Sequence, residues 1–260
     1  MAETHEARSP VASTVVTAAE MLEYIAERGR VLPRDLAGDL NLNRSTVHRM
    51  LYTLELLNYV GKLPDGAYRL TFHLFEIGNS VPHSHNLIDT ARRELLQLSH
   101  DTGLTVNHGV LYDDQVLYVD KATPSTYLQL DRSVGESEPL HCTSVGKVLL
   151  AYSLPDQREK ILARLKLPSF TPHTIRTVEA LRTELEQVRQ DRYAVDRQEL
   201  NLEVRCVAAP VLDRQNLIIS GISISGPEDR FTPEMIPLLV PRLQETATRV
   251  QENMRAISPR

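Results

Sequence analysis

The feature of this sequence that most constrains its fold is a series of three helical segments and a hairpin turn within the first 70 residues. Apolar residues recur at helical spacing from Thr14 to Arg28, along "LPRDLAGDL", and from Arg44 to Leu57. The stretch "YVGKLPDGAYRL" then holds two short extended runs about a Pro-Asp-Gly turn, which proline's fixed φ and glycine's conformational freedom favour. Three helices followed by a β-hairpin predict a winged helix-turn-helix.

The third helical segment carries a cluster of hydrogen-bonding side chains in its first turns. In a helix-turn-helix, the second helix of the motif enters the major groove of DNA and offers these turns to base edges. No carboxylate lies between Asp39 and Glu55, so the local charge is positive although the whole chain has a formal net charge of −5. Arginine can donate two hydrogen bonds to guanine, and serine or threonine can contact bases or phosphates.

These properties predict a DNA-binding surface on this segment and on the hairpin. Asn43 is placed to cap the free N–H groups of the helix. A tyrosine one turn further along and a lysine on the wing can reach phosphates. A lone capped helix would more simply be a solvated face, but the ordered series of three helices and a hairpin favours DNA binding. The predicted DNA contacts are Arg44, Ser45, Thr46, His48, Arg49, Tyr52 and Lys62.

After Gly103 the pattern changes from helical spacing to alternation. Strands are predicted at "TVNHGVL", "QVLYVDKA" and "TYLQLD", and a later hairpin has the arms "VRCVAAPVLD" and "LIISGISISG". Helices are predicted from Thr143 to Tyr152, at "PDQREKILARL", from Val178 to Arg189 with Thr177 as cap, and from Thr232 onwards, where Pro237 and Pro241 should bend or split the last helix.

Two further helical stretches, "TFHLFEIGNSV" and "HNLIDTARRELLQLSHDTG", are expected to be broken near Pro82. We read the first as a linker. The chain is therefore predicted to be an α/β two-domain protein. Its parts are a winged helix-turn-helix over residues 11–71, a linker helix region over 72–90 and a second domain over 91–256.

Composition excludes several classes of protein. The chain has 260 residues, enough for two domains, and no apolar run approaches the roughly 18 residues that span a bilayer. The N-terminal "MAETHEARSPVAS" lacks the basic start and apolar stretch of a secretion signal. Two cysteines without metal-ligand spacing fit a reducing compartment. We expect a cytoplasmic location and no membrane partner.

The residues also resemble a known family. The stretches "LAGDLNLNRSTVHRMLYTLELLNYV" and "YRLTFHLFEIG" resemble the IclR (isocitrate lyase regulator) family of bacterial transcription regulators. In the second half, "PLHCTSVGKVLLA", "VRCVAAPVLD" and "SISGPEDRFTPE" are similar to that family's effector-binding domain, in the same order. Within the family, "LTFHLFEIGN" together with "HNLID" is most similar to the subgroup that represses sugar-acid breakdown, such as the 2-keto-3-deoxygluconate repressors.

The resemblance implies a fold and a function. The fold is a winged helix-turn-helix, a linker helix and an α+β, GAF-like effector-binding domain with a mainly antiparallel sheet. The function is that of a DNA-binding regulator, a repressor by default, of a catabolic operon. It would act as a homodimer, or a dimer of dimers (a homotetramer), on a palindromic operator in double-stranded DNA. A small organic acid or sugar acid would control it, without a cofactor.

The family's effector pocket can be carried onto this chain position by position. The positions are Leu130, Ser144, Val145, Asp196, Val204, Cys206, Ser223 and Ser225. Ser223 and Ser225 are two apart on an apolar strand, so both hydroxyls point to one face and need a partner, which is another core group, a water or a small polar ligand. The segment "CTSVGKVLL" passes from a loop into a helix whose first N–H groups can hold a carboxylate.

Two departures from the family pattern bear on the effector. Glu138 stands where an apolar residue is common, and Asn107-His108 replaces a His-then-apolar pair. If Glu138 and Asp196 both faced one ligand, a hydroxyl-rich sugar acid or lactone would fit better than a bare carboxylate. Alternatively, Glu138 points outward, as isolated charged residues usually do.

Three other functions are possible from the sequence: an enzyme, a metal-responsive regulator, and a ligand-binding module that does not bind DNA. An enzyme could use Cys142 beside His141, or Cys206, as a nucleophile. However, neighbouring side chains on a strand point to opposite faces, and no nucleophile elbow is present, so we expect no catalytic residue. A metal-responsive regulator would need histidines from different strands to converge. Of the nine histidines in the chain, the candidates are His83, His85, His100, His108 and His141. They lack zinc-site spacing, so we expect no metal.

Overall fold

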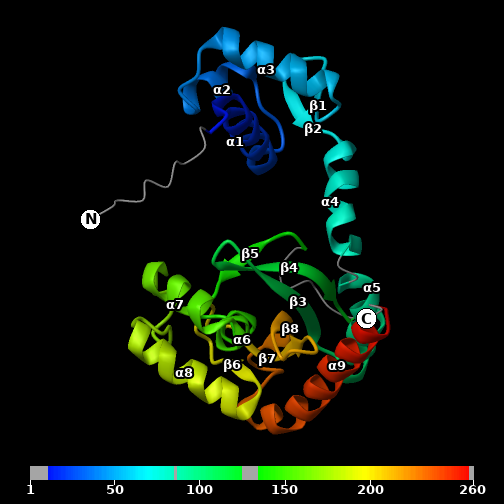
Figure 1. The fold of residues 1–260 in the computed structure, drawn as a ribbon, viewed down its shortest axis with the longest axis vertical. Coiled ribbons are helices and arrows are strands. Elements are labelled where there is room, and N and C mark those ends of the chain that lie inside the picture. The colour runs from blue at the N-terminus through cyan, green and yellow to red at the C-terminus, as the bar shows by residue number, and fades with distance from the viewer. Residues whose placement is uncertain (1–10, 85–86, 125–133, 258–260) are drawn as a thin grey trace, which may run out of the picture. The chain divides into compact units, whose positions relative to one another are not determined.

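The computed structural model describes residues 11–84, 87–124 and 134–257, and it divides into two compact units, residues 1–81 and 82–260 (Figure 1). The first unit begins with α1 (Ser13–Arg28), α2 (Pro33–Asp39) and α3 (Arg44–Leu56). An antiparallel hairpin follows, formed by β1 (Val60–Lys62) and β2 (Tyr68–Leu70). The predicted winged helix-turn-helix is therefore confirmed.

The apolar stripes of the three helices meet in one core. Met21 and Ile25 of α1, Leu36 of α2, and Val47 and Leu51 of α3 are fully buried together. This packing stabilises short helices that would not persist alone in water. The predicted cap is absent: the backbone of Asn43 occupies the N-cap position, but its side chain makes no capping hydrogen bond.

Helix α4 (Phe72–Ser84) follows the hairpin and ends in the second unit, where α5 (Leu87–Thr102) begins. Two separate helices are present, as expected, and α4 continues through Pro82 to end two residues later, at Ser84. The strand predicted at "TYLQLD" lies outside the described residues.

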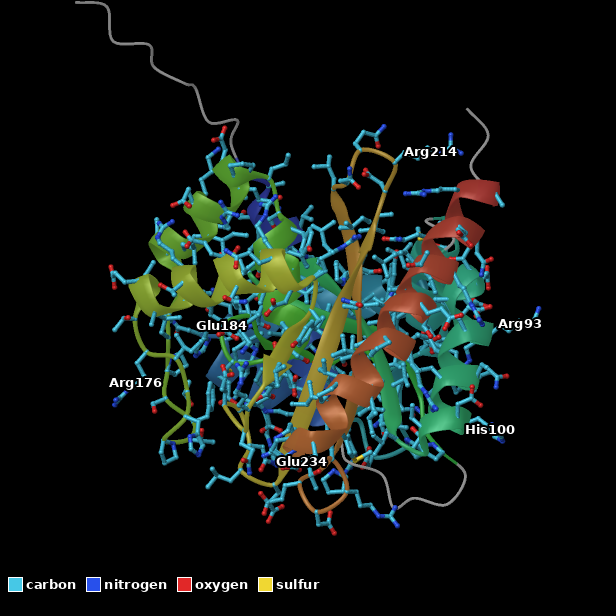
Figure 2. The ribbon with its side chains drawn as sticks, turned by 90° about the horizontal axis from the view of Figure 1, so that it is seen from below. Arg93, His100, Arg176, Glu184, Arg214 and Glu234 are labelled. Atoms are coloured by element: carbon cyan, nitrogen blue, oxygen red, sulfur yellow. The ribbon has the colours of Figure 1, made fainter. Side chains whose placement is uncertain are left out.

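The second unit is a three-layer α/β/α structure with a six-stranded antiparallel sheet in the order β5-β4-β3-β8-β7-β6. The strands are β3 (Thr105–Tyr112), β4 (Gln115–Ala122), β5 (Ser137–Pro139), β6 (Ala194–Asp196), β7 (Val204–Leu212) and β8 (Ile218–Pro227). Helices α6 (Ser144–Tyr152), α7 (Pro155–Arg164) and α8 (Val178–Asp191) lie on one face, while α5 and α9 (Ile236–Ile257) lie on the other. Figure 2 shows the strands between these two helical layers, with Glu184 on one side and Arg93 and His100 on the other.

A short 3₁₀ turn, η1 (Pro233–Met235), precedes α9. Of the two expected effects of the prolines, the split is wrong, because α9 continues through Pro241, and the bend stays a prediction. Pro237 falls in the first turn of α9, where a missing N–H costs no intrahelical hydrogen bond.

Candidate DNA-binding and effector sites

The predicted DNA-contacting side chains lie on the outer face of α3. Arg44, Ser45, His48, Arg49 and Tyr52 are exposed and Thr46 is half-buried, while the apolar residues between them are buried. The alternation arises because the helix period places its apolar stripe toward α1 and α2 and its polar side chains toward solvent. Neither arginine has an ion-pair partner among the described residues, so both charges remain available to an anion.

The hairpin adds positive charge of its own. Lys62 of β1 is exposed, with its Nζ 6.0 Å from the centre of the Tyr68 ring. On the facing strand, Arg69 is exposed opposite Gly61 and is free of ion pairs among the described residues. Sequence reasoning missed Arg69, although its place between the more buried Tyr68 and Leu70 in an alternating strand was the available signal.

The predicted effector residues that the structure describes are all buried in the second unit. Asp196, Cys206 and Ser225 occupy adjacent register positions on β6, β7 and β8, and Ser223 lies two residues along from Ser225. Val204 pairs with Pro227 at the end of the same hairpin. Ser144 and Val145 open α6, and Leu130 lies outside the described residues.

The first turn of helix α6 lies very close to strands β3 and β8 of the sheet, beside the candidate effector site. A methyl group at Gly109 would lie 3.0 Å from Val145 Cγ1, and one at Gly221 would lie 3.1 Å from the same atom. Glycine on both strands leaves room for this approach. Val145 therefore packs over two glycines that lie two residues, about 7 Å along the strands, from Asn107 and Ser223.

The first turn of α6 offers free hydrogen-bond donors. Thr143 caps the helix, accepting from the Gly146 N–H at 3.1 Å and donating to the Pro139 carbonyl at 2.8 Å. The N–H groups of Ser144 and Val145 have no acceptor among the described residues. Two buried N–H groups at a helix N-terminus, where the helix dipole is positive, suit a carboxylate.

Asn107 joins the two predicted serines. Its Nδ2 donates to Ser225 Oγ at 3.0 Å and to Ser223 Oγ at 3.4 Å, and all three side chains are buried. We call this group, Asn107 with Ser223 and Ser225, the Asn107 cluster. The sequence marked Asn107 only as a departure from the family pattern.

Three carboxylates lie on β5, on β6 and just after β6, where Glu138 is half-buried and Asp196 and Glu199 are buried. The Glu199 N–H donates to Asp196 Oδ1 at 2.7 Å, and Tyr118 Oη donates to Glu138 Oε2 at 2.8 Å. Burial, and then the charges of Asp196, Glu199 and Glu138, raise the pKa of the Cys142 thiol above its usual range. All three carboxylates therefore act on the same buried region. The protonated thiol is poorly suited to nucleophilic catalysis.

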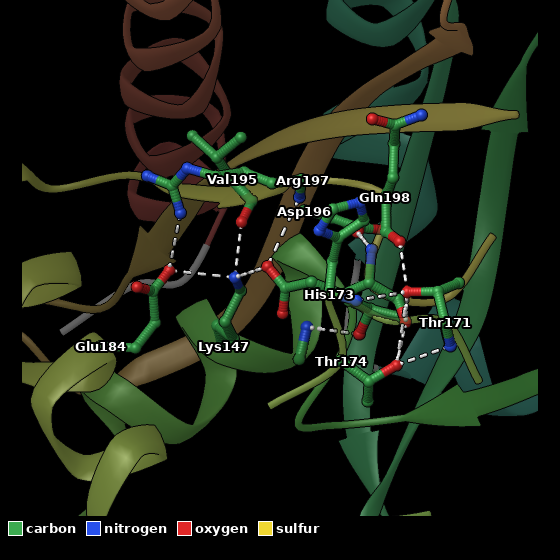
Figure 3. Close-up of polar contacts among 12 residues, drawn as sticks. Lys147, Thr171, His173, Thr174, Glu184, Val195, Asp196, Arg197 and Gln198 are labelled. Atoms are coloured by element: carbon green, nitrogen blue, oxygen red, sulfur yellow. Dashed lines mark hydrogen bonds and ion pairs between the residues drawn. The ribbon is translucent and has the colours of Figure 1, made fainter. Parts of the chain in front are cut away.

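A buried lysine offsets part of this negative charge (Figure 3). Lys147 is fully buried, and its Nζ donates to Glu184 Oε1 at 2.9 Å, to Glu199 Oε1 at 2.7 Å and to the Val195 carbonyl. Burial alone would raise the pKa of Glu184, but Lys147 and Arg197 lower it below the usual value. The lysine thus ties α6 to α8 and to the end of β6.

The loop after β6 is held by hydroxyl groups. Thr171 Oγ1 donates to the Gln198 carbonyl at 2.7 Å, and Thr174 Oγ1 donates to the Glu199 carbonyl at 2.6 Å. Figure 3 shows these bonds beside the Lys147 ion pairs. Since Glu199 also binds Asp196, the geometry of the Asp196 carboxylate depends on this whole network.

The buried histidines do not converge. His108 Nε2 lies 2.7 Å from Ser220 Oγ, whereas His141 Nε2 lies 3.0 Å from the Pro168 carbonyl. Burial lowers the pKa of His108 to about 4 and also lowers that of His141, so both rings are neutral at pH 7. Within residues 11–84, 87–124 and 134–257, no three His, Cys, Asp or Glu side chains are grouped to hold a metal ion.

Comparison with known proteins decides the family. The family model described as "IclR helix-turn-helix domain" matches residues 14–64, and "Bacterial transcriptional regulator IclR C-terminal" matches residues 79–252. The chain belongs to the IclR family. Its N-terminal unit is the DNA-binding part of a transcriptional regulator, and its C-terminal unit is a ligand-binding domain.

Two curated relatives and one solved structure illustrate the match. HTH-type transcriptional regulator KdgR of Escherichia coli K12 is 33% identical over 93% of this chain and 92% of its own length. Transcriptional repressor IclR of the same organism is 32% identical over 84% and 81%. The crystal structure of an IclR homolog complexed with 4-hydroxybenzoate, from Microbacterium hydrocarbonoxydans, covers 94% of this chain and 99% of its own with a TM-score of 0.83 at 22% identity, so it shows the shared fold.

These IclR-family relatives are transcriptional regulators, not enzymes. In the part of this family member that the structure describes, no helix combines the length and the apolar character needed to cross a membrane.

Proposed function

We propose that this protein is a cytoplasmic repressor of a catabolic operon that leaves its operator when a small sugar acid or another organic acid binds to the C-terminal unit. The observation that carries the effector chemistry is the set of buried donors without acceptors. These donors are the N–H groups of Ser144 and Val145, which face the same side of the sheet as the Asn107 cluster. Buried donors are costly unless an acceptor satisfies them, and a carboxylate does so.

The acidic side of the site favours a ligand that also carries hydroxyl groups. Asp196 and Glu138 lie near enough to Cys142 to raise the pKa of its thiol, and carboxylates accept hydrogen bonds from hydroxyls. A bare acid would meet repulsion there, whereas a sugar acid such as 2-keto-3-deoxygluconate would place its carboxylate at α6 and its hydroxyls near these side chains. The resemblance of the sequence to the sugar-acid repressor subgroup supports this class of ligand, and the 33% identity to KdgR is consistent with that subgroup.

The DNA-binding unit is proposed to act as a homodimer, or a dimer of dimers, on a palindromic operator in double-stranded DNA. Helix α1 exposes Val15 and Val16, and α4 exposes Phe72, Phe75 and Ile77. Large apolar side chains gathered on two helices are usually covered by a partner, and a second copy of the chain supplies the two-fold symmetry that a palindrome requires. The proposed DNA contacts are the exposed polar side chains of α3, with Lys62 and Arg69 on the wing.

Thermal unfolding of the purified protein against a panel of keto acids, sugar acids, lactones and aromatic acids tests this function. A ligand at 100 times its Kd adds about 2.7 kcal/mol of stability, which raises the Tm by several degrees. We expect a sugar acid to give this shift, and the double variant Ser223→Ala/Ser225→Ala to lose it. Ser220→Ala is the matched control, since Ser220 is a buried serine of β8 that binds His108 on the opposite face. A shift that survives the double variant would contradict the proposed site.

A further inference from the structure

The hydrogen-bond inventory of the Asn107 cluster leaves two donors unused. Both amide hydrogens of Asn107 are directed at the oxygens of Ser223 and Ser225. Each hydroxyl keeps one O–H group, and neither O–H has an acceptor among the described residues. Turning the amide over would leave two N–H groups instead of two O–H groups. In either orientation, two buried donors remain for an acceptor that the described chain does not supply.

The unused donors lie on the face of the sheet that α6 covers. Val145 of α6 packs against Gly109 and Gly221, which are each two residues from Asn107 and Ser223 on the same strands. Side chains two residues apart on a strand share a face. The cluster and the free N–H groups of α6 therefore face the same buried region from two sides.

We propose that Asn107 sets the preference of the effector site for acids. Its amide holds the Ser223 and Ser225 oxygens so that the cluster presents two hydrogen-bond donors to an oxygen of a bound carboxylate or 2-keto acid. The inference rests on the proposed effector site and adds to it the residue that determines its polarity. Asn107 acts through the serines, so it is a positioning residue.

The polarity can be reversed without changing the size of the side chain. In Asn107→Asp, the carboxylate accepts both serine O–H groups, so no donor remains for the ligand, and a negative charge is added. In Asn107→Leu, the amide is lost but the serine hydroxyls stay free to rotate and donate. Asn107→Asp should therefore weaken the binding of an anion more strongly than Asn107→Leu does.

Isothermal titration calorimetry of the full chain tests this with two probes, 2-keto-3-deoxygluconate and its uncharged methyl ester. Relative to the ester, Asn107→Asp should lower the affinity for the acid about tenfold or more, because hydrogen bonds to a charged group are lost. Asn107→Leu, which removes the amide but adds no charge, should lower the acid-to-ester affinity ratio by a smaller factor than Asn107→Asp does. Ser220→Ala, on the opposite face of β8, should leave both affinities unchanged.

An acid-to-ester affinity ratio that is equal in the wild type and Asn107→Asp would overturn the inference while leaving the effector site standing. A wild-type chain that binds neither compound would overturn the proposed sugar-acid effector and this inference with it. If Asn107→Asp does not fold, the single variants Ser223→Ala and Ser225→Ala take its place. Each removes one donor and should lower the acid-to-ester ratio, and unchanged ratios in both would overturn the inference.

Discussion

A single buried cation organises much of the C-terminal unit. Lys147 contributes its charge to two carboxylates, on α8 and on the loop after β6, and it is fully buried. Removing one partner of such a group leaves uncompensated charge in a poorly solvated interior. The lysine therefore acts on stability and, through Glu199, on the position of Asp196.

Lys147→Met should destabilise the C-terminal unit by about 3–5 kcal/mol at pH 7, measured by chemical denaturation. The exposed pair Arg164–Asp114 gives the control, because Arg164→Ala breaks an ion pair that water already screens and should leave stability nearly unchanged. Lys147 lowers the pKa of Glu184 below its ordinary value of 4.5. The stabilisation from this ion pair is therefore present above pH 4.5 and is lost as the pH falls and Glu184 becomes protonated. The difference in free energy of unfolding between the wild type and Lys147→Met should therefore become smaller in acid. A difference that stays constant with pH would argue against the ion pairs as its cause.

At the scale of the element, α3 combines a buried apolar stripe with an exposed basic face. Val47, Leu51 and Leu54 fix the helix in the core, so changes on its outer face should alter DNA binding without altering the fold. Arg44 and Arg49 make no ion pair with the residues described. Replacing them should therefore change DNA affinity without changing the stability of the fold.

Arg44→Ala/Arg49→Ala should weaken operator binding by about 2–6 kcal/mol, since each base contact contributes about 1–3 kcal/mol, with an unchanged Tm. Fluorescence anisotropy against a duplex selected from random sequence by the wild-type protein measures this. Arg69→Ala should instead weaken binding to all duplexes similarly and reduce the salt dependence by about one phosphate contact. Equal loss on selected and random DNA in the α3 double variant would assign those arginines to the phosphate backbone.

Local patterns were sufficient for most elements, but they missed the three-residue edge strands β5 and β6 and did not give the long-range contacts. The apolar spacing of α1 to α3, the Pro-Asp-Gly turn and the alternating arms of β7 and β8 could all be read from neighbouring residues. The pairing of Asn107 with Ser223 joins residues 116 positions apart, and strand register over such a distance is not encoded locally. Lys147 was equally hidden, because a lysine is expected in solvent, although the apolar residues on both sides of it in α6 were a signal.

At the scale of the whole molecule, two units must communicate through the chain that joins them. Effector binding is proposed to bias two arrangements of the dimer, with α4 carrying the change to the spacing of the two recognition helices. A ligand can shift such an equilibrium only by its difference in affinity for the two arrangements. Half-sites lie about one helical turn of DNA or a multiple of it apart, so a modest change in spacing is sufficient to weaken binding.

Linking the two copies through α4 tests this coupling. Phe75 is 68% exposed on α4, and both native cysteines are buried, so Phe75→Cys introduces one accessible thiol per chain. The disulfide-linked dimer should bind operator DNA but should no longer release it when 2-keto-3-deoxygluconate is added, because the two α4 helices are held at one separation. Reduction should restore release, and Leu217→Cys, exposed in the C-terminal unit, should respond normally throughout. A linked dimer that releases DNA as the reduced protein does would show that the signal reaches the recognition helices without a change between the α4 helices.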